Sequence, residues 1–182
     1  MARRPPDISA QNSTRSDIFG DPNKGAGRFV TVTEWENGAQ TKSNARRFSV
    51  ATDEPLALGG TDAAIDPMEL LLAAMGSCLA IGWAKQSEMR KIELRHLRIT
   101  VEATYDLRGY LELDATIRPG FLTITYNVDV DTDADKVTLA EIKQAAENTS
   151  ALFDNILNST PVRGLVTRGV AASQNRPRRK RK

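Results

Sequence analysis

Alternating apolar and polar residues predict several β-strands, because successive side chains of a strand point to opposite faces of a sheet. The predicted strands span residues 28–35, about 47–52, 97–105 and 122–130, with a further candidate at 162–170. The dipeptide Asn37–Gly38 follows the first strand and is a strong hairpin signal.

Two other segments carry apolar residues at helical spacing. In the first, Asp66 is a good N-cap, Pro67 suits the first helical position, and Glu69 completes a capping box. This helix is apolar over most of its circumference, which is typical of a helix at the centre of a fold. The second is predicted over residues 138–157, with Thr138 at its N-cap. The order of strands and helices predicts an α+β fold with helices packed on antiparallel sheet.

Composition divides the chain into three parts. Residues 1–27 are rich in Pro, Gly, Ser, Asn and Asp, so we expect a flexible N-terminal arm before a domain at 28–170. The net charge is +2, but the last seven residues carry six cations. Residues 171–182 therefore predict a disordered basic tail. The tail has no interleaved aromatic residue for base stacking, so no specific nucleic-acid partner is expected.

The remaining composition indicates an ordinary protein of the cytoplasm. The chain has 182 residues, 40% of them hydrophobic, which suits one domain. No apolar run approaches the roughly 18–20 residues needed to span a bilayer, and no secretory signal follows the N-terminal arginines, so no membrane partner is expected. One cysteine and one histidine cannot supply the usual zinc ligand sets, so neither a metal nor another cofactor is expected.

Cys78, the lone cysteine, lies inside the first predicted helix. Two interpretations are open for it. A free cysteine is often an inert buried residue, here packed on a stripe of small side chains with Ala74 and Gly82. Alternatively it is a reactive thiol, which must ionise to act as a nucleophile.

Three segments resemble one known family. Residues 53–78, with Asp66-Pro-Met-Glu-Leu-Leu-Leu-Ala-Ala-Met-Gly-Ser-Cys78, residues 106–121 and residues 150–162 are similar to OsmC/Ohr proteins, and the resemblance extends over about 28–170. It implies an OsmC-like fold: antiparallel sheets wrapped around two central helices in an intertwined homodimer, with active sites at the subunit interface. It also implies reduction of organic hydroperoxides by a reactive cysteine, which a second cysteine resolves as a disulfide.

The resemblance places Cys78 at the peroxide-attacking position, which an arginine and a glutamate assist in the family. Cys78 is about three turns inside its helix, too far for the helix dipole to stabilise a thiolate. A cation from the N-terminal strands is therefore expected. Arg28, Arg46 and Arg47 are the candidates, and Arg47 is the first choice.

Two family positions are changed. The family's glutamate corresponds to Met68 here, and Glu69 comes one residue later, rotated by about 100° around the helix. Glu69 is a candidate assistant of Cys78, although it also has the capping role. Ser150 stands where the second cysteine would be, so no disulfide can form within one chain. The oxidised Cys78 would need an external thiol, or a disulfide between subunits.

The sequence therefore predicts a thiol-dependent peroxidase acting on hydrophobic hydroperoxides in oxidative stress defence. Its substrate pocket is expected to involve Met68, Leu71, Ser150 and Phe153. The alternative is a non-catalytic OsmC-like protein that binds an apolar small molecule at the dimer interface. Thiol chemistry of another kind also remains open.

Overall fold

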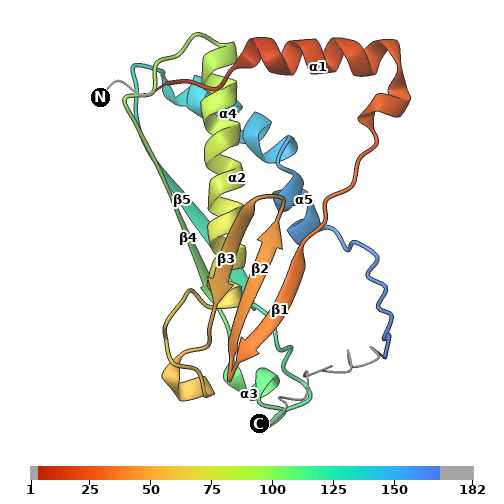
Figure 1. Cartoon of the computed structure of the whole chain (residues 1–182). Helices are drawn as coiled ribbons and strands as arrows, with labels where there is room; N and C mark the ends of the chain where they lie inside the picture. Colours follow the sequence, from red (N-terminus) through yellow and green to blue (C-terminus); the bar gives the residue numbers. More distant parts are fainter. Residues whose placement is uncertain (1–3, 169–182) are drawn as a thin grey trace, which may run out of the picture.

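The computed structural model describes residues 4–168 and contains helices with two antiparallel sheets, which confirms the α+β class (Figure 1). The elements in chain order are α1 (Ile8–Gly20), β1 (Val32–Asn37), β2 (Gln40–Ala45), β3 (Phe48–Thr52), α2 (Pro67–Met89), β4 (His96–Thr104), α3 (Leu107–Tyr110), β5 (Thr123–Asp131), α4 (Lys136–Asn148) and α5 (Ala151–Leu157). Two short 3-10 turns, η1 (Pro22–Gly25) and η2 (Leu56–Leu58), lie in the connections.

The helix α2 forms the axis of the molecule. Its predicted capping box is present: the Asp66 side chain accepts from the Met68 N–H at 2.6 Å, and Glu69 accepts from the Asp66 N–H at 3.2 Å. These bonds satisfy N–H groups that have no partner within the helix. One side of α2 packs against β4 and another against α4 and α5. The helix thus joins the β4–β5 sheet to the C-terminal helices.

The buried core is small and lies along the side of α2 that packs against α4. Its central cluster comprises Trp83 of α2 with Ile142 and Ala146 of α4. Gly82 permits this approach, because a Cβ atom added there would lie 3.2 Å from the Ala146 Cβ. The other fully buried apolar side chains, Met75 and Leu79, also belong to α2. The core therefore holds α2 against α4.

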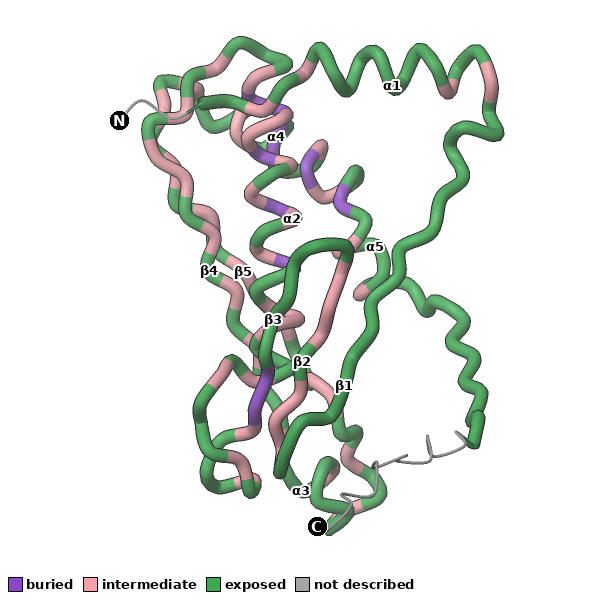
Figure 2. Tube along the Cα trace, in the orientation of Figure 1, coloured by how far each residue is buried: buried purple, intermediate pink, exposed green. Residues whose placement is uncertain are grey.

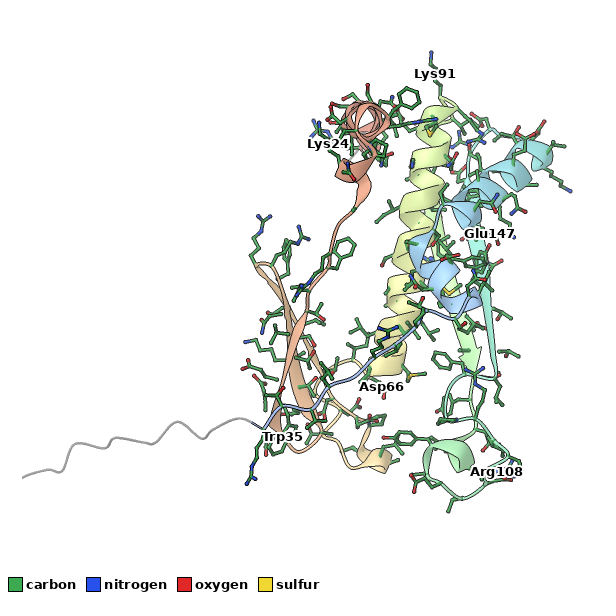
Figure 3. All side chains as sticks on the ribbon, turned by 90° about the vertical axis from the view of Figure 1, so that its right-hand side faces the viewer. Lys24, Trp35, Asp66, Lys91, Arg108 and Glu147 are labelled. Carbon is green, nitrogen blue, oxygen red and sulfur yellow. The ribbon has the colours of Figure 1, made fainter. Side chains whose placement is uncertain are left out.

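The three-stranded sheet β1–β2–β3 stands apart from this core (Figures 1 and 3). All six residues of β1 are exposed. The register places Trp35, Phe48 and Val50 on one face of the sheet, and all three are exposed. Figure 2 shows the contrast: most buried residues lie along α2, α4 and the start of α5, and the sheet is buried only at the end of β3. The chain by itself leaves an apolar sheet face uncovered.

Much of α2 is also uncovered. Its 18-residue apolar window has a mean hydropathy of 1.4 and only 17% of it is buried. By length and composition alone it could cross a membrane, although polar residues interrupt its apolar run. The central helix of a water-soluble fold passes the same test.

Several sequence-based boundaries were wrong. Polar β2 was missed, because a strand without apolar alternation gives no periodic signal. The first strand begins at Val32, not at residue 28. The second predicted helix is two helices, α4 and α5. Asp135, rather than Thr138, caps α4 and accepts the Thr138 N–H at 2.8 Å.

The two ends of the chain also differ from expectation. Within the predicted irregular arm, residues 8–20 form α1, capped by Asp7 and without a buried residue. Helix formation there comes from local capping, since no apolar stripe is present to dock it. Residues 162–168 form no strand, and the remainder of that candidate strand lies outside the described residues, as does the basic tail at 171–182.

Candidate functional site

Cys78 and Ser150 meet where α2 contacts the start of α5. The Ser150 hydroxyl donates a hydrogen bond to the Cys78 sulfur at an Oγ–Sγ distance of 3.1 Å. Ser150 is buried, with 4% of its surface exposed, whereas Cys78 is half-buried. The sulfur therefore has a fixed neighbour on its protein side while part of the residue remains reachable.

Ser150 is held by its own backbone and side chain. It is the N-cap of α5, and its hydroxyl oxygen accepts the Phe153 N–H at 3.2 Å. Its backbone N–H donates to the Glu147 carbonyl at the end of α4. The break between α4 and α5 thus points this side chain at Cys78.

Phe153 lies at the same junction and belongs to a larger cluster. Its ring meets Tyr126 of β5 edge to face, with centroids 6.2 Å apart. Tyr126 donates a short hydrogen bond to Glu147, which also receives the Lys143 ammonium at 2.7 Å. Burial and the Glu147 carboxylate raise the pKa of Tyr126. This cluster ties α4 to β5 beside Ser150.

Sequence reasoning missed the Tyr126–Glu147 contact. Burial favours the neutral form of Glu147, but hydrogen bonds from Lys143 and Tyr126 prevail and lower its pKa. The same carboxylate raises the pKa of Lys143. Only the spacing of Lys143 and Glu147, four residues apart on one helix, was available as a sequence signal.

The candidate arginines lie on or before the separate sheet. Arg46 and Arg47 form the turn between β2 and β3, with Arg46 in a left-handed conformation at φ 56°. Both guanidinium groups stack on Phe48, at 5.2 and 4.9 Å from its ring centroid. Arg28 is exposed before β1. Among residues 4–168, no arginine makes a hydrogen bond to Cys78, whose described polar contact is with Ser150.

Glu69 is not beside Cys78 within one chain. Nine residues of helix turn it by about 180° and displace it by about 13 Å along the axis. Its carboxylate is engaged in the capping box. Leu71, seven residues before Cys78, shares the helix face of Cys78, whereas Met68 does not. The structure therefore brings Ser150 to Cys78, with Phe153 bonded to Ser150, places Leu71 on the same helix face, and leaves Met68 and Glu69 elsewhere.

Met68 lines a separate cavity of about 310 Å³ at the start of α2. Its apolar wall includes Leu72, Tyr105, Tyr110 and Phe121, and four carboxylates lie around it: Glu54, Asp66, Glu69 and Asp106. Burial and the neighbouring Asp66 raise the pKa of Glu54. No group of three or more His, Cys, Asp or Glu side chains within the described part of the chain is placed to hold a metal ion.

Comparisons with known proteins identify the family and the fold. The family model described as OsmC-like protein matches residues 60–163, a range that includes α2, Cys78 and Ser150. No match was found among curated proteins.

Solved structures with OsmC-like descriptions share the fold. An OsmC-like protein from Mycoplasma pneumoniae has a TM-score of 0.63 at 10% identity, covering 73% of this chain and 89% of its own. An osmotic stress induced and detoxification response protein from Psychrobacter arcticus has a TM-score of 0.59 at 14% identity, covering 71% and 89%. An organic hydroperoxide resistance protein OsmC from Legionella pneumophila has a TM-score of 0.52 at 16% identity, covering 72% and 91%. At these identities the likeness shows the fold alone.

Proposed function

The chain belongs to the OsmC-like protein family, and on this premise we propose that it reduces organic hydroperoxides with Cys78 as part of oxidative stress defence. The observation that carries the proposal is the hydrogen bond from the buried Ser150 hydroxyl to the half-buried Cys78 sulfur. A hydroxyl donor favours the ionised form of a thiol, and the thiolate is the nucleophile.

The proposed reaction consumes one hydroperoxide and two external thiols. The Cys78 thiolate attacks the terminal peroxide oxygen, the O–O bond breaks, and the departing alkoxide takes a proton to become an alcohol. Cys78 is thereby oxidised to the sulfenic acid. An external thiol displaces water to form a mixed disulfide, and a second thiol releases reduced Cys78 and an external disulfide. Ser150 has no sulfur, so it cannot replace the first external thiol by forming a disulfide with Cys78.

We infer further that the working form is a homodimer. The uncovered face of the β1–β3 sheet carries Trp35, Phe48 and Val50, and α2 exposes Ile81. A group of exposed apolar side chains on one sheet face is typical of an interaction surface. A second copy covering it would also explain how Arg46 or Arg47 could reach a cysteine that its own chain does not bring near. We infer that protein, rather than lipid, covers the exposed side of α2, because the OsmC-like family model matches residues on both sides of this helix.

Intact mass after mixing reduced protein with cumene hydroperoxide tests the activity. We expect a rapid gain of about 16 Da, one oxygen, reversed by a small thiol and absent in Cys78→Ser. Prolonged exposure without thiol should add a second oxygen, because no cysteine protects the sulfenic acid. A mass unchanged by hydroperoxide in the native, dimeric protein would exclude the peroxidase function.

The 310 Å³ cavity supports a second function, binding of an apolar small molecule. Its aromatic and aliphatic wall does not include Cys78, so binding there requires no thiol chemistry. Native mass spectrometry of the purified protein would detect a retained ligand. We expect such a ligand to persist in Cys78→Ser and to be lost in Tyr110→Ala. Loss in Cys78→Ser would tie the ligand to the thiol site instead.

A further inference from the structure

Within residues 4–168, no hydrogen bond or ion pair joins the Cys78 sulfur to a cation, although the proposed reaction needs a thiolate. The guanidinium groups of Arg46 and Arg47 stack on Phe48 of the separate sheet. Within residues 4–168, the polar group that touches the sulfur is the Ser150 hydroxyl. The question is whether this hydroxyl acts on the reactivity of Cys78 or merely caps α5.

The hydroxyl of Ser150 is arranged as a donor. Its oxygen already accepts the Phe153 N–H at 3.2 Å. That bond occupies one lone pair of the oxygen, so the hydroxyl proton is free to be donated to the sulfur, which lies 3.1 Å from Oγ. Backbone bonds on both sides, from Ser150 to Glu147 and from Asp154 to Ser150, hold the residue in place.

Burial increases the effect of this donor. Ser150 is 4% exposed, so water does not compete for its hydroxyl. A hydrogen bond to an ionised partner is shorter and stronger than one between neutral groups, and more so where solvent is excluded. The bond therefore stabilises the thiolate more than the thiol. A capping role alone would require only the oxygen and not the proton.

We propose that Ser150 is a positioning residue for Cys78, holding a proton toward the sulfur so that the thiolate forms and is presented to the hydroperoxide. This inference rests on Cys78 being the reactive group of the proposed function. Ser150 acts through Cys78 and contacts no substrate in the first step. After attack, the sulfur carries the new oxygen, and Ser150, having no thiol, leaves the sulfenic acid open to an external thiol.

Three substitutions separate donation from capping. Ser150→Ala removes both the proton and the capping oxygen. Ser150→Asp keeps a capping oxygen, since aspartate is a good N-cap, but it supplies no proton and adds negative charge beside the sulfur. Ser150→Thr keeps both functions. Asp135→Ala is the matched control, because it removes the cap of α4 without touching Cys78.

The readout is the rate of Cys78 alkylation by iodoacetamide in the folded protein, measured from pH 6 to 10. At pH 7 we expect Ser150→Ala to slow alkylation about tenfold, as for loss of a hydrogen bond to a charged group. Ser150→Asp should be slower still, and Ser150→Thr should approach the wild-type rate. The differences should shrink toward pH 10, where free thiols are ionised in every variant. Asp135→Ala should alter thermal stability and leave alkylation unchanged.

Two results would overturn the proposal: wild-type alkylation in Ser150→Asp, or equal rates in wild type and Ser150→Ala. Iodoacetamide involves no peroxide, so this outcome is distinguishable from failure of the proposed function. Fast oxidation by cumene hydroperoxide with alkylation insensitive to Ser150 would leave the peroxidase and remove the positioning role. Alkylation rates that follow the Ser150 substitutions, without any oxidation of Cys78 by hydroperoxide, would keep the positioning role and exclude the peroxidase function.

Discussion

The junction of α2 with α4 and α5 differs from the β1–β3 sheet in what its own chain supplies. At the junction, Ile142 and Ala146 are fully buried and Ser150 has partners on both sides of its hydroxyl. On the sheet, Trp35 is 73% exposed and the arginines of the β2–β3 turn stack on Phe48 alone. One region buries its central side chains within a single chain, whereas the other presents a bare apolar face.

This difference separates the candidate site into two halves. The half that contains Cys78 and Ser150 is assembled by tertiary packing within one chain. The half that would contribute a cation belongs to the bare sheet, and we expect a second copy to bring it. Stability and reactivity should therefore respond differently to changes in the two regions.

The largest contrast is expected between core and sheet truncations. Ile142→Ala should lower the free energy of unfolding by about 2–5 kcal/mol, because it leaves a cavity in the packed cluster. Trp35→Ala should instead weaken dimerisation, so that its effect on melting temperature depends on protein concentration. Calorimetry at several concentrations measures both. A loss in Trp35→Ala that is independent of concentration would show that the sheet is stabilised within its own chain.

A change of mechanism is expected next, from Ser150→Cys. The Ser150 oxygen lies 3.1 Å from the Cys78 sulfur, so a sulfur at that position needs only a small approach to bond. We expect hydroperoxide to yield a protein about 2 Da lighter than its reduced form, in place of the one-oxygen adduct. Intact mass, with Ser77→Cys as the neighbouring control, detects it. A persistent oxygen adduct in Ser150→Cys would contradict the geometry.

Chain mixing tests whether the two halves of the site come from different copies. Alone, Arg47→Ala should slow Cys78 oxidation about tenfold, because a nearby cation favours the thiolate. Mixed dimers of Arg47→Ala chains with Cys78→Ser chains should recover activity, since intact Cys78 then faces intact Arg47 across the interface. Stopped-flow oxidation of the mixture measures this. Recovery absent from verified mixed dimers would place the cation in the same chain, and the Arg46→Ala pair is the parallel control.

The sequence predicted elements whose signals are local. The capping residues around Asp66 identified the start of α2, and clear alternation identified β4 and β5, although β1 began later than expected. Sequence patterns failed where tertiary contacts decide the structure. Polar β2 forms because β1 and β3 pair with it. The break between α4 and α5 lies at Ser150, whose side chain contacts Cys78.

For the candidate site, the sequence indicated the position of Ser150 but not its hydrogen bonds. The resemblance placed Ser150 at the position facing Cys78, and the structure shows that contact. Its role as a hydrogen-bond donor depends on the Phe153 N–H, which no pattern of residue types reveals. Arg47 stays a prediction, because within residues 4–168 the described polar contact of Cys78 is with Ser150.

The smallest expected effect concerns the loop that joins the two regions. This loop, residues 53–66, is organised by buried Asp53, whose carboxylate accepts the Thr61 hydroxyl at 2.5 Å and the backbone N–H groups of Glu54, Thr61 and Ala63. Gly60 closes the turn, because a Cβ there would lie 1.8 Å from the Glu54 carbonyl oxygen. The loop therefore fixes the connection between β3 and the start of α2.

The Thr61 hydroxyl bond and the three N–H donors outweigh burial and lower the pKa of Asp53 from 3.8 to about 2. Its contribution to stability is thus complete above pH 3.8 and is lost as the pH falls toward about 2. We expect the Thr61 and Ala63 amide resonances to shift below pH 3.8, separately from any change at higher pH caused by Glu54, whose pKa is raised. In Asp53→Asn this shift should vanish, since the amide does not titrate. Absence of this shift in the wild-type protein, or its persistence in Asp53→Asn, would mean that another group holds the loop that connects the sheet to α2.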